Sequence, residues 1–235
     1  MTVVVVPENF VGPPGVGHGG YVAGLLARHV DGAVQVTLRR PTPPGVPLSI
    51  VEADGRVELR DAGELLADAE PATLELDVPP APGPSAALVA EVGSPSRWEG
   101  GGVHPICLGC SLARDDDEGL EVAVGPLEVD GHEEVAAVWR PPARLAGADG
   151  AIDPVWVLAA LDCPGAMAYI ARDTFAGLLG RIVFDQTGPV EPDVDHVVFG
   201  WQIGVEGRKL FAGTAVATAD GTVLARTRQT WFAMS

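Results

Sequence analysis

A histidine and two glycines stand at the start of an apolar segment, in the stretch PGVGHGGYVAGLLA at residues 14–27. Glycine destabilises a helix through backbone entropy, so a pair of glycines at a helix start indicates that bare backbone is needed there. The unpaired N–H groups of a helix N-terminus point outward, and they can donate to an oxygen that gains negative charge. We therefore predict that the backbone N–H of Gly19 or Gly20 is an oxyanion donor. His18 either orients substrate or water, or only caps the helix.

A second group of reactive side chains lies in the stretch HPICLGC. His104, Cys107 and Cys110 have the close spacing of a metal-binding knuckle, and Cys163 is a candidate fourth ligand. Zinc sites of this kind usually have two such pairs of ligands, whereas this chain has one. We therefore favour a loop that packs on the core and expect no metal and no other cofactor. Cys163 is also a candidate nucleophile, but the sequence offers it no identifiable companion histidine.

Length and composition exclude several classes of protein. The 235 residues are 47% hydrophobic, which suffices for one large domain or two small ones. A formal net charge of -17 repels phosphates, so nucleic acid is not an expected partner. No apolar run approaches the roughly 18 residues of a membrane span, and the N-terminus lacks the pattern of a secretory signal. The chain has 3 cysteines, an odd number that fits a reducing compartment. We expect a cytoplasmic protein without membrane partners.

An internal repeat indicates how the chain is organised. Residues 55–68 (GRVELRDAGELLAD) and residues 207–220 (GRKLFAGTAVATAD) align without a gap, with identities at Gly55/Gly207, Arg56/Arg208, Ala67/Ala219 and Asp68/Asp220. Each segment follows one strand-like stretch and leads to another. The turns EADGR and VEGRK join these strands.

Each half also has an apolar helical segment upstream of its repeat, at residues 19–30 and 154–171, and each helix follows a predicted strand, TVVVV or EEVAAVW. The predicted order in each half is therefore strand, helix and several antiparallel strands. A single long helix must pack into the curled sheet to bury both apolar faces. A Pro- and Gly-rich connection between the halves is expected to cross the surface. The alternative is an unrelated pair of α+β domains.

The stretch GHGGYVAGLLA, followed by VQVTLRRPTPPGVPLSIVEA, resembles the signature of the PaaI-type hotdog acyl-CoA thioesterases. In that family HGG opens the central helix, and a later strand ends in an R-P turn with glycine. The resemblance is direct over residues 14–60, and the order of elements carries it over residues 133–232. It implies an α+β double hotdog fold, with a hotdog at residues 1–92, a linker at 93–119 and a second hotdog at 120–235.

The resemblance also implies a carboxylate nine positions after the HGG histidine, but that position is Ala27 here. Placing Asp153 at the position of His18 puts Asp162 at the ninth position of the second half. Thioester hydrolysis needs a donor for the oxyanion and a carboxylate that attacks the carbonyl carbon or activates water. Asp162 is thus the predicted catalytic carboxylate, as nucleophile or general base. Because it precedes Cys-Pro-Gly, a helix end or turn is the alternative role.

Helix geometry decides how these groups must combine. Nine residues of helix span roughly 13 Å, so one helix cannot bring its own start and its ninth residue to the same carbonyl. We predict one site, made of His18, Gly19 and Gly20 from the first helix and Asp162 from the second. The equivalent position, Asp153 with Ala27, lacks an acid, lacks a glycine and has a proline that removes one donor.

Four residues near strand ends are candidates for substrate binding. Arg39 and Arg40 end a strand in LRRP, where either could meet a phosphate of coenzyme A, although a solvated strand end is equally compatible with the sequence. Gln186 and Thr187, in the corresponding strand of the second half, are candidates to place a water or the thioester oxygen.

The leading functional hypothesis is a thioesterase that acts on an acyl-CoA or acyl-carrier thioester. A non-catalytic acyl-CoA or acyl-chain binding protein is the alternative. A hotdog hydratase or dehydratase is disfavoured because its usual D-x4-H arrangement beside a helix is missing from the sequence. The fused chain corresponds to a dimer of single hotdogs, so one chain can function alone. A homo-oligomer of such chains is a further expected form.

Overall fold

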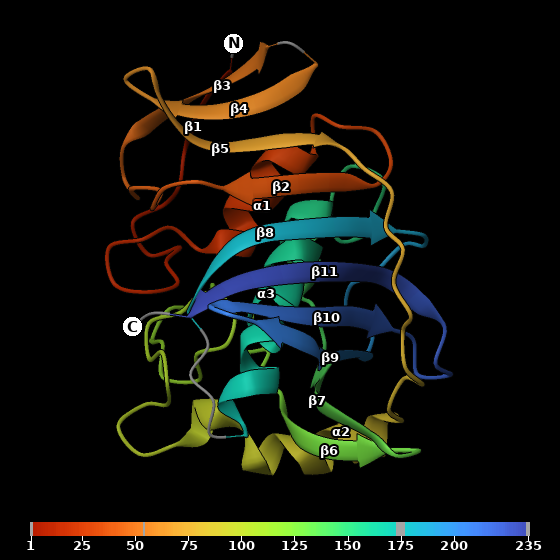
Figure 1. Cartoon of the computed structure of the whole chain (residues 1–235). Coiled ribbons are helices and arrows are strands. Elements are labelled where there is room, and N and C mark those ends of the chain that lie inside the picture. Colours follow the sequence, from red (N-terminus) through yellow and green to blue (C-terminus); the bar gives the residue numbers. More distant parts are fainter. Residues whose placement is uncertain (1, 54, 173–176, 234–235) are drawn as a thin grey trace.

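The computed structural model describes residues 2–53, 55–172 and 177–233, so Asp54 of the predicted turn EADGR lies outside the described residues. Across these residues the strands form one 11-stranded antiparallel sheet in the order β1-β3-β4-β5-β2-β8-β11-β10-β9-β7-β6 (Figure 1). The strands are β1 (Thr2–Val5), β2 (Val34–Leu38), β3 (Pro47–Ala53), β4 (Arg56–Asp61), β5 (Glu64–Pro71), β6 (Gly125–Val129), β7 (His132–Trp139), β8 (Gly177–Gln186), β9 (His196–Glu206), β10 (Lys209–Ala217) and β11 (Val223–Ala233). The helices are α1 (Gly19–Ala27), α2 (Pro84–Ala90) and α3 (Pro154–Ile170), with short 3₁₀ turns at Glu91–Gly93, Pro95–Arg97 and Ala143–Leu145.

Counted outward from the centre of the sheet, equivalent strands follow in the same order in both halves. At the centre β2 pairs antiparallel with β8, and Val34 lies opposite Phe184. The strands β5, β4, β3 and β1 follow on one side, and β11, β10, β9 and β7 follow on the other. Each half thus runs strand, helix and four strands, as the sequence predicts, while β6 adds an edge strand to the second half. This is the arrangement expected of two α+β units joined in tandem.

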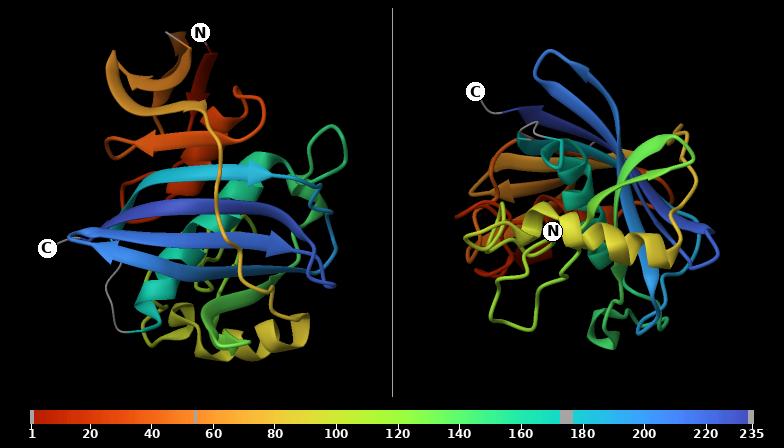
Figure 2. Two further views of the ribbon diagram at one scale, coloured as in Figure 1. Left: turned by 45° about the vertical axis from the view of Figure 1, so that its right-hand side comes forward. Right: turned by 90° about the horizontal axis from the view of Figure 1, so that it is seen from below.

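The curved sheet wraps around α1 and α3, which pack against each other on its inner side (Figures 1 and 2). Their side chains are buried on nearly all sides, which explains why both helix segments are apolar throughout. The described helix α1 ends at Ala27, earlier than the predicted residue 30. The chain turns just beyond, where Gly32 has a positive φ of 74°.

Helix α3 continues through a proline. This shows whether Asp162, which precedes that proline, lies at a helix end or inside the helix. Pro164 lies inside the helix, whose last residue is Ile170. A proline in a helix interior removes one backbone hydrogen bond and usually bends or ends the helix, which made a helix end before it plausible from the sequence. The structure contradicts that alternative: Asp162 lies in the helix interior, about the middle of α3.

Two glycines of α1 allow the two helices to approach at backbone distance. A Cβ atom on Gly20 would lie 2.5 Å from the Leu158 carbonyl oxygen, and one on Gly24 would lie 2.5 Å from the Val155 Cα. Because these glycines are one helical turn apart, they share one face of α1. The close contact of Gly20 in the HGG stretch is therefore followed by a second one, between Gly24 and Val155, which the sequence analysis did not anticipate.

The gap-free alignment of the internal repeat agrees with the structure at its start and disagrees with it at its end. Gly55 and Gly207 both have positive φ, at 74° and 58°, and both occupy the turn between equivalent strands, β3–β4 and β9–β10. Asp68, however, lies in β5, whereas Asp220 lies in the turn after β10. The gap-free alignment loses register because β10 has 9 residues and β4 has 6.

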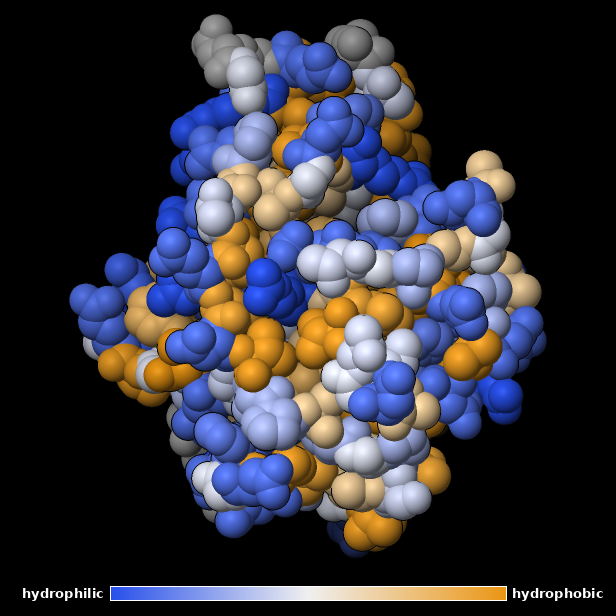
Figure 3. Space-filling model, turned by 90° about the vertical axis from the view of Figure 1, so that its right-hand side faces the viewer, coloured by the Kyte–Doolittle hydropathy of each residue, from blue (hydrophilic) through white to orange (hydrophobic). Residues whose placement is uncertain are grey.

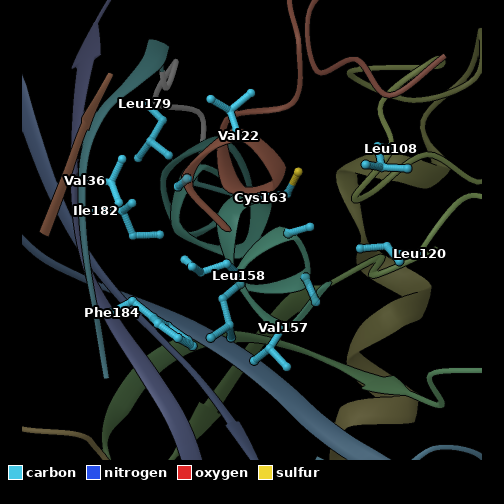
Figure 4. Packing of buried hydrophobic residues seen from close by; sticks show 14 of the residues in the cluster. Val22, Val36, Leu108, Leu120, Val157, Leu158, Cys163, Leu179, Ile182 and Phe184 are labelled. Atoms are coloured by element: carbon cyan, nitrogen blue, oxygen red, sulfur yellow. The ribbon is translucent and has the colours of Figure 1, made fainter. Parts of the chain in front are cut away.

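The chain between the halves packs on the protein in two places. Residues 72–83 run across the outer face of the C-terminal strands toward α2, which contacts β6 and β7 (Figure 2). The predicted surface linker at 93–119 is partly wrong in character, because Cys107, Leu108 and Cys110 are buried in the main core. Figure 4 shows α1 and α3 between the sheet residues Val36, Ile182 and Phe184 on one side and the loop residues Leu108 and Leu120 on the other.

On the face drawn in Figure 3, hydrophilic and hydrophobic residues are interspersed. Within the described ranges, none of the helices has both the length and the apolar character needed to cross a bilayer.

The close helix contact gives a prediction for Gly24→Ala. An alanine in an exposed helix position is about 1 kcal/mol more favourable than glycine. Here the added methyl meets the Val155 backbone at 2.5 Å, so overpacking dominates. We expect the free energy of unfolding, measured with denaturant, to fall by about 1–3 kcal/mol. The control is Gly204→Ala, where no atom lies within 4 Å of the added methyl. Equal effects of the two substitutions would contradict the assigned contact.

A buried carboxyl group in β7 predicts how stability depends on pH. Burial raises the pKa of Glu134 from 4.5 to about 8, and neither carboxyl oxygen has a hydrogen-bond partner in the described part of the chain. The folded protein therefore binds a proton that the unfolded chain releases, and stability falls as pH rises from 4.5 to about 8.

The substitution Glu134→Gln removes this buried charge. We expect the variant to unfold at nearly the wild-type denaturant concentration at pH 5 and to be more stable by about 2 kcal/mol or more at pH 9. Glu133→Gln, at a largely exposed neighbour, serves as the control. A Glu134→Gln effect that is the same at both pH values would show that the buried carboxyl does not titrate as described.

Candidate active site

The start of α1 is held by the segment before it. The His18 N–H donates to the Phe10 carbonyl, and the Gly17 N–H donates to the Thr42 carbonyl. The His18 side chain caps the helix, because its Nδ1 accepts a hydrogen bond from the Tyr21 N–H at 3.3 Å. His18 is only 1% exposed, so it is part of the interior as well as a cap.

Asp162 meets the start of α1 directly. Its Oδ2 accepts a hydrogen bond of 2.6 Å from the Gly20 N–H and lies 3.5 Å from His18 Nδ1. Asp162 is 4% exposed, and its other oxygen, Oδ1, has no hydrogen-bond partner among the described residues. The structure thus brings together His18, Gly19, Gly20 and Asp162, from two helices that are far apart in the sequence.

The electrostatics of this pair follow from burial. Burial raises the pKa of Asp162, and the His18 charge and the Gly20 N–H offset only part of that effect. For His18, burial lowers the pKa, but the Asp162 carboxylate and the Cys107 side chain outweigh it, so the pKa of His18 is raised. A carboxylate with a raised pKa is a stronger base than an exposed one, which suits proton removal.

A network of buried polar groups fixes α3 at the residue before Asp162. The Leu161 carbonyl accepts hydrogen bonds from Gln229 Nε2 at 2.6 Å and from Thr214 Oγ1 at 2.9 Å. Trp231 Nε1 in turn donates to Gln229 Oε1. The sequence analysis missed this network. The only signal was polar residues at alternate positions of the apolar strand β11, in TRQTW.

A cavity of about 440 Å³ opens beside Asp162. Of the predicted site residues, it is lined by His18, Gly19, Arg39, Arg40 and Asp162. Apolar side chains supply much of the remaining wall, among them Val22, Leu38, Met167, Leu179 and Trp231. The cavity therefore combines one buried carboxylate with an apolar wall, which is the usual composition of a small-molecule site.

The two arginines lie at the cavity but differ in how firmly they are held. Arg39 forms an ion pair with the buried Asp68, which also receives a bond from Arg56. Arg40 pairs with Glu64 at 2.8 Å, and both of these side chains are more than half exposed. Because exposed ion pairs contribute little, Arg40 is the arginine that is free to turn to a ligand.

Gln186 and Thr187 do not line this cavity, contrary to the sequence prediction. Gln186 Nε2 donates to the Gly188 carbonyl, and Thr187 Oγ1 donates to backbone carbonyls at the start of β11. The physical reason is the antiparallel pairing of β2 with β8. Equivalent ends of these strands point in opposite directions, so Arg40 and Gln186 lie at opposite ends of the pair.

The equivalent position on the other side of the helix pair holds an ion pair. Asp153 caps α3 by accepting from the Val155 N–H, and it receives a bidentate bond from Arg28, next to Ala27. A cation thus faces this helix start, where Asp162 faces the start of α1. Ala27 stands at the position that corresponds to Asp162, so the second position has no carboxylate facing its helix start.

Cys107 and Cys163 lie next to the imidazole ring of His18. Cys163 Sγ is 3.6 Å from His18 Nε2 and 3.5 Å from Cys107 Sγ, and all three cysteines are buried. The sequence analysis grouped Cys107 with His104, but the structure places His18 there instead. It also gives Cys163 the companion histidine that the sequence did not reveal, because residues 18 and 163 meet only where the helices cross.

Comparisons with known proteins support the fold. No family model matches the sequence, and no curated protein matches it at a significant level. Among solved structures, a tesB protein of Mycobacterium avium subspecies paratuberculosis has a TM-score of 0.63 at 15% identity, covering 98% of this chain and 91% of its own. The acyl-CoA thioesterase II TesB2 of Mycobacterium marinum has a TM-score of 0.57 at 14% identity, covering 97% and 90%.

A third structure names the fold. A protein with a hot dog fold from Alicyclobacillus acidocaldarius has a TM-score of 0.62 at 14% identity, and the match covers 99% of this chain and 92% of that one. Because these matches extend over nearly the whole chain, they include both halves of the sheet. The chain has the α+β double hotdog fold.

Proposed function

We propose that the chain hydrolyses an acyl thioester at a single composite site between its two halves. The observation that carries this proposal is the 2.6 Å hydrogen bond from the Gly20 N–H to Asp162 Oδ2. This bond sets a buried carboxylate against the N-terminus of the facing helix. It supports a division of labour in which α1 supplies the oxyanion donor and α3 supplies the acid.

The contacts suggest a role for each group. Since the Gly20 N–H already donates to Asp162, the Gly19 N–H is the donor for the thioester oxygen, at the positive end of the α1 dipole. Asp162 Oδ2 is held, while Oδ1 is unpartnered among the described residues, so Oδ1 either attacks the carbonyl carbon or removes a proton from an attacking water. When Asp162 attacks, the carbon–sulfur bond breaks, the acyl group stays on Asp162 as an anhydride, the thiolate takes a proton from water, and a second water hydrolyses the anhydride. When water attacks, the carbon–sulfur bond breaks and the proton that Asp162 removed passes to the leaving thiolate.

The surroundings of Asp162 suit an acyl-CoA or an acyl-carrier thioester. The apolar cavity wall would hold the acyl chain, and its volume of about 440 Å³ limits the length of that chain. Arg40 lies at the cavity and would meet a phosphate of the carrier. The name of the M. marinum structure, an acyl-CoA thioesterase II, agrees with this substrate class.

The substitution Asp162→Asn tests the proposed acid. Asparagine keeps an oxygen for the Gly20 N–H but loses the negative charge, so we expect kcat/KM toward acyl-CoA substrates to fall by about 100-fold or more. Release of free thiol, followed with a thiol indicator, measures the rate. Asp153→Asn is the matched control, because Asp153 is an acid of the same helix that pairs with Arg28 and lies outside the proposed site, and it should keep activity within about threefold.

Circular dichroism would show that both variants fold. If wild type and Asp162→Asn hydrolyse the substrates equally fast, the assigned mechanism is wrong. If the wild type binds acyl-CoA without hydrolysing it, the chain is instead the non-catalytic binding protein that the sequence left as the alternative.

Arg40→Gln tests whether the carrier phosphates are recognised. We expect KM for an acyl-CoA to rise about two- to fivefold, because an exposed charge contact contributes roughly 0.2–1 kcal/mol. The KM for an acyl-pantetheine, which lacks the nucleotide phosphates, should not change. The same rise in KM for both substrates would show that Arg40 acts on the acyl or pantetheine part instead.

A further inference from the structure

Two of the chain's three cysteines, Cys107 and Cys163, lie beside His18. His18 comes from the start of α1, Cys107 and Cys110 come from the loop before β6, and Cys163 comes from the middle of α3. One nitrogen or sulfur donor atom from each of His18, Cys107 and Cys163 lies within 4.8 Å of the other two. Cys110, three residues after Cys107, is buried in the same core.

The spacing of these donors is close to that of a tetrahedral metal site. With Zn–S bonds of about 2.3 Å and Zn–N bonds of about 2.0–2.1 Å, a tetrahedron has S···S edges of about 3.8 Å and S···N edges of about 3.6 Å. The observed separations are 3.5 Å between Cys107 Sγ and Cys163 Sγ, and 3.6 Å between Cys163 Sγ and His18 Nε2. These two separations therefore agree with the edges of a tetrahedral site to within a few tenths of an ångström.

The loop backbone passes close to the cluster at Gly109. A Cβ on Gly109 would lie 2.8 Å from His18 Nε2 and 2.9 Å from Cys163 Sγ. A glycine between Cys107 and Cys110 thus lets the loop reach both donors. Two further bonds hold the loop, since the Leu108 N–H donates to the Val11 carbonyl and the Val122 N–H donates to the Gly109 carbonyl.

The Asp162 carboxylate lies near His18 Nδ1, the ring nitrogen that faces away from the cysteines, as in many zinc sites. Ligation through Nε2 requires the hydrogen on Nδ1, and Asp162 Oδ2 lies 3.5 Å from that nitrogen. Nδ1 would then donate to Asp162 in place of accepting the 3.3 Å bond from Tyr21. Asp162 Oδ1 takes no part in this arrangement.

We propose that His18, Cys107 and Cys163 bind a thiophilic divalent ion of the Zn²⁺ type, with Cys110 as the nearest candidate for a fourth ligand. This site replaces His104 of the sequence-derived knuckle with His18. The ion ties the loop at 103–124 to the crossing of α1 and α3. The inference is independent of the proposed thioesterase, because it is tested by metal content and not by turnover.

Zinc titration of the reduced, metal-stripped chain tests the site. We expect about one equivalent of Zn²⁺ per chain to remain after gel filtration, measured by elemental analysis. Co²⁺ as a probe should give thiolate-to-cobalt charge-transfer absorption together with the visible bands of tetrahedral coordination. Cys107→Ser and Cys163→Ser should each bind less than about one tenth of an equivalent and lose the charge-transfer band or reduce it.

His104→Asn is the matched control and should retain the full equivalent, because His104 is not in the cluster. Far-ultraviolet circular dichroism of each serine variant shows whether it folds. If a serine variant does not fold, the cobalt spectrum of the wild-type chain decides, since thiolate charge transfer requires cysteine ligands.

Three results would overturn the proposal. One is a wild-type chain that keeps no zinc after gel filtration. Another is a chain whose cobalt spectrum lacks sulfur ligation. The third is a thiol titration of the unfolded, unreduced chain that finds one free thiol instead of three, because a disulfide would then remove at least one of the two cysteine donors, Cys107 and Cys163.

Discussion

The close crossing of α1 and α3 is the constraint on which the rest of the structure depends. Gly20 and Gly24 remove the side chains that would keep the helix backbones apart, and the distances of 2.5 Å from an added methyl to α3 leave no room for alanine. Only at this separation does the Gly20 N–H reach Asp162 Oδ2 at 2.6 Å. The same crossing brings His18 to Cys163. The glycines at the start of α1 thus serve helix packing as well as the exposure of bare amides.

The two halves share one fold but face each other with different chemistry. Their strands are arranged symmetrically about the β2–β8 pair, so each helix start meets the middle of the other helix. At one crossing a buried acid meets glycine amides, and at the other Arg28 pairs with Asp153. The Asp153–Arg28 pair is partly exposed, whereas Asp162 is not. Burial costs free energy for an ionised group, and it raises the pKa of the Asp162 carboxyl.

The loop between the halves closes the interior on the side of the helices away from the sheet. Leu108 and Leu120 pack there, and Cys107 and Cys110 join the same core. This cover adds to the burial of His18 and Asp162, and the low dielectric of a buried site strengthens the interaction between them. The sequence suggested a surface connection because proline and glycine are frequent in it. The apolar residues inside the loop, which lie among those glycines and prolines, decided where it packs.

The sequence by itself determined the order of elements, the two helix segments, the HGG helix start and, through its resemblance to a known family, the pairing of His18, Gly19 and Gly20 with Asp162. These features depend on local patterns: apolar runs, glycine positions and the length of a helix. Four outcomes needed the tertiary structure: the Gly24 contact, the Gln229 network, the placement of Gln186 and Thr187 away from the cavity, and the exchange of His104 for His18 beside the cysteines. Each depends on which residues of distant segments meet. That is set by strand register and helix crossing, and no pattern along one segment encodes it.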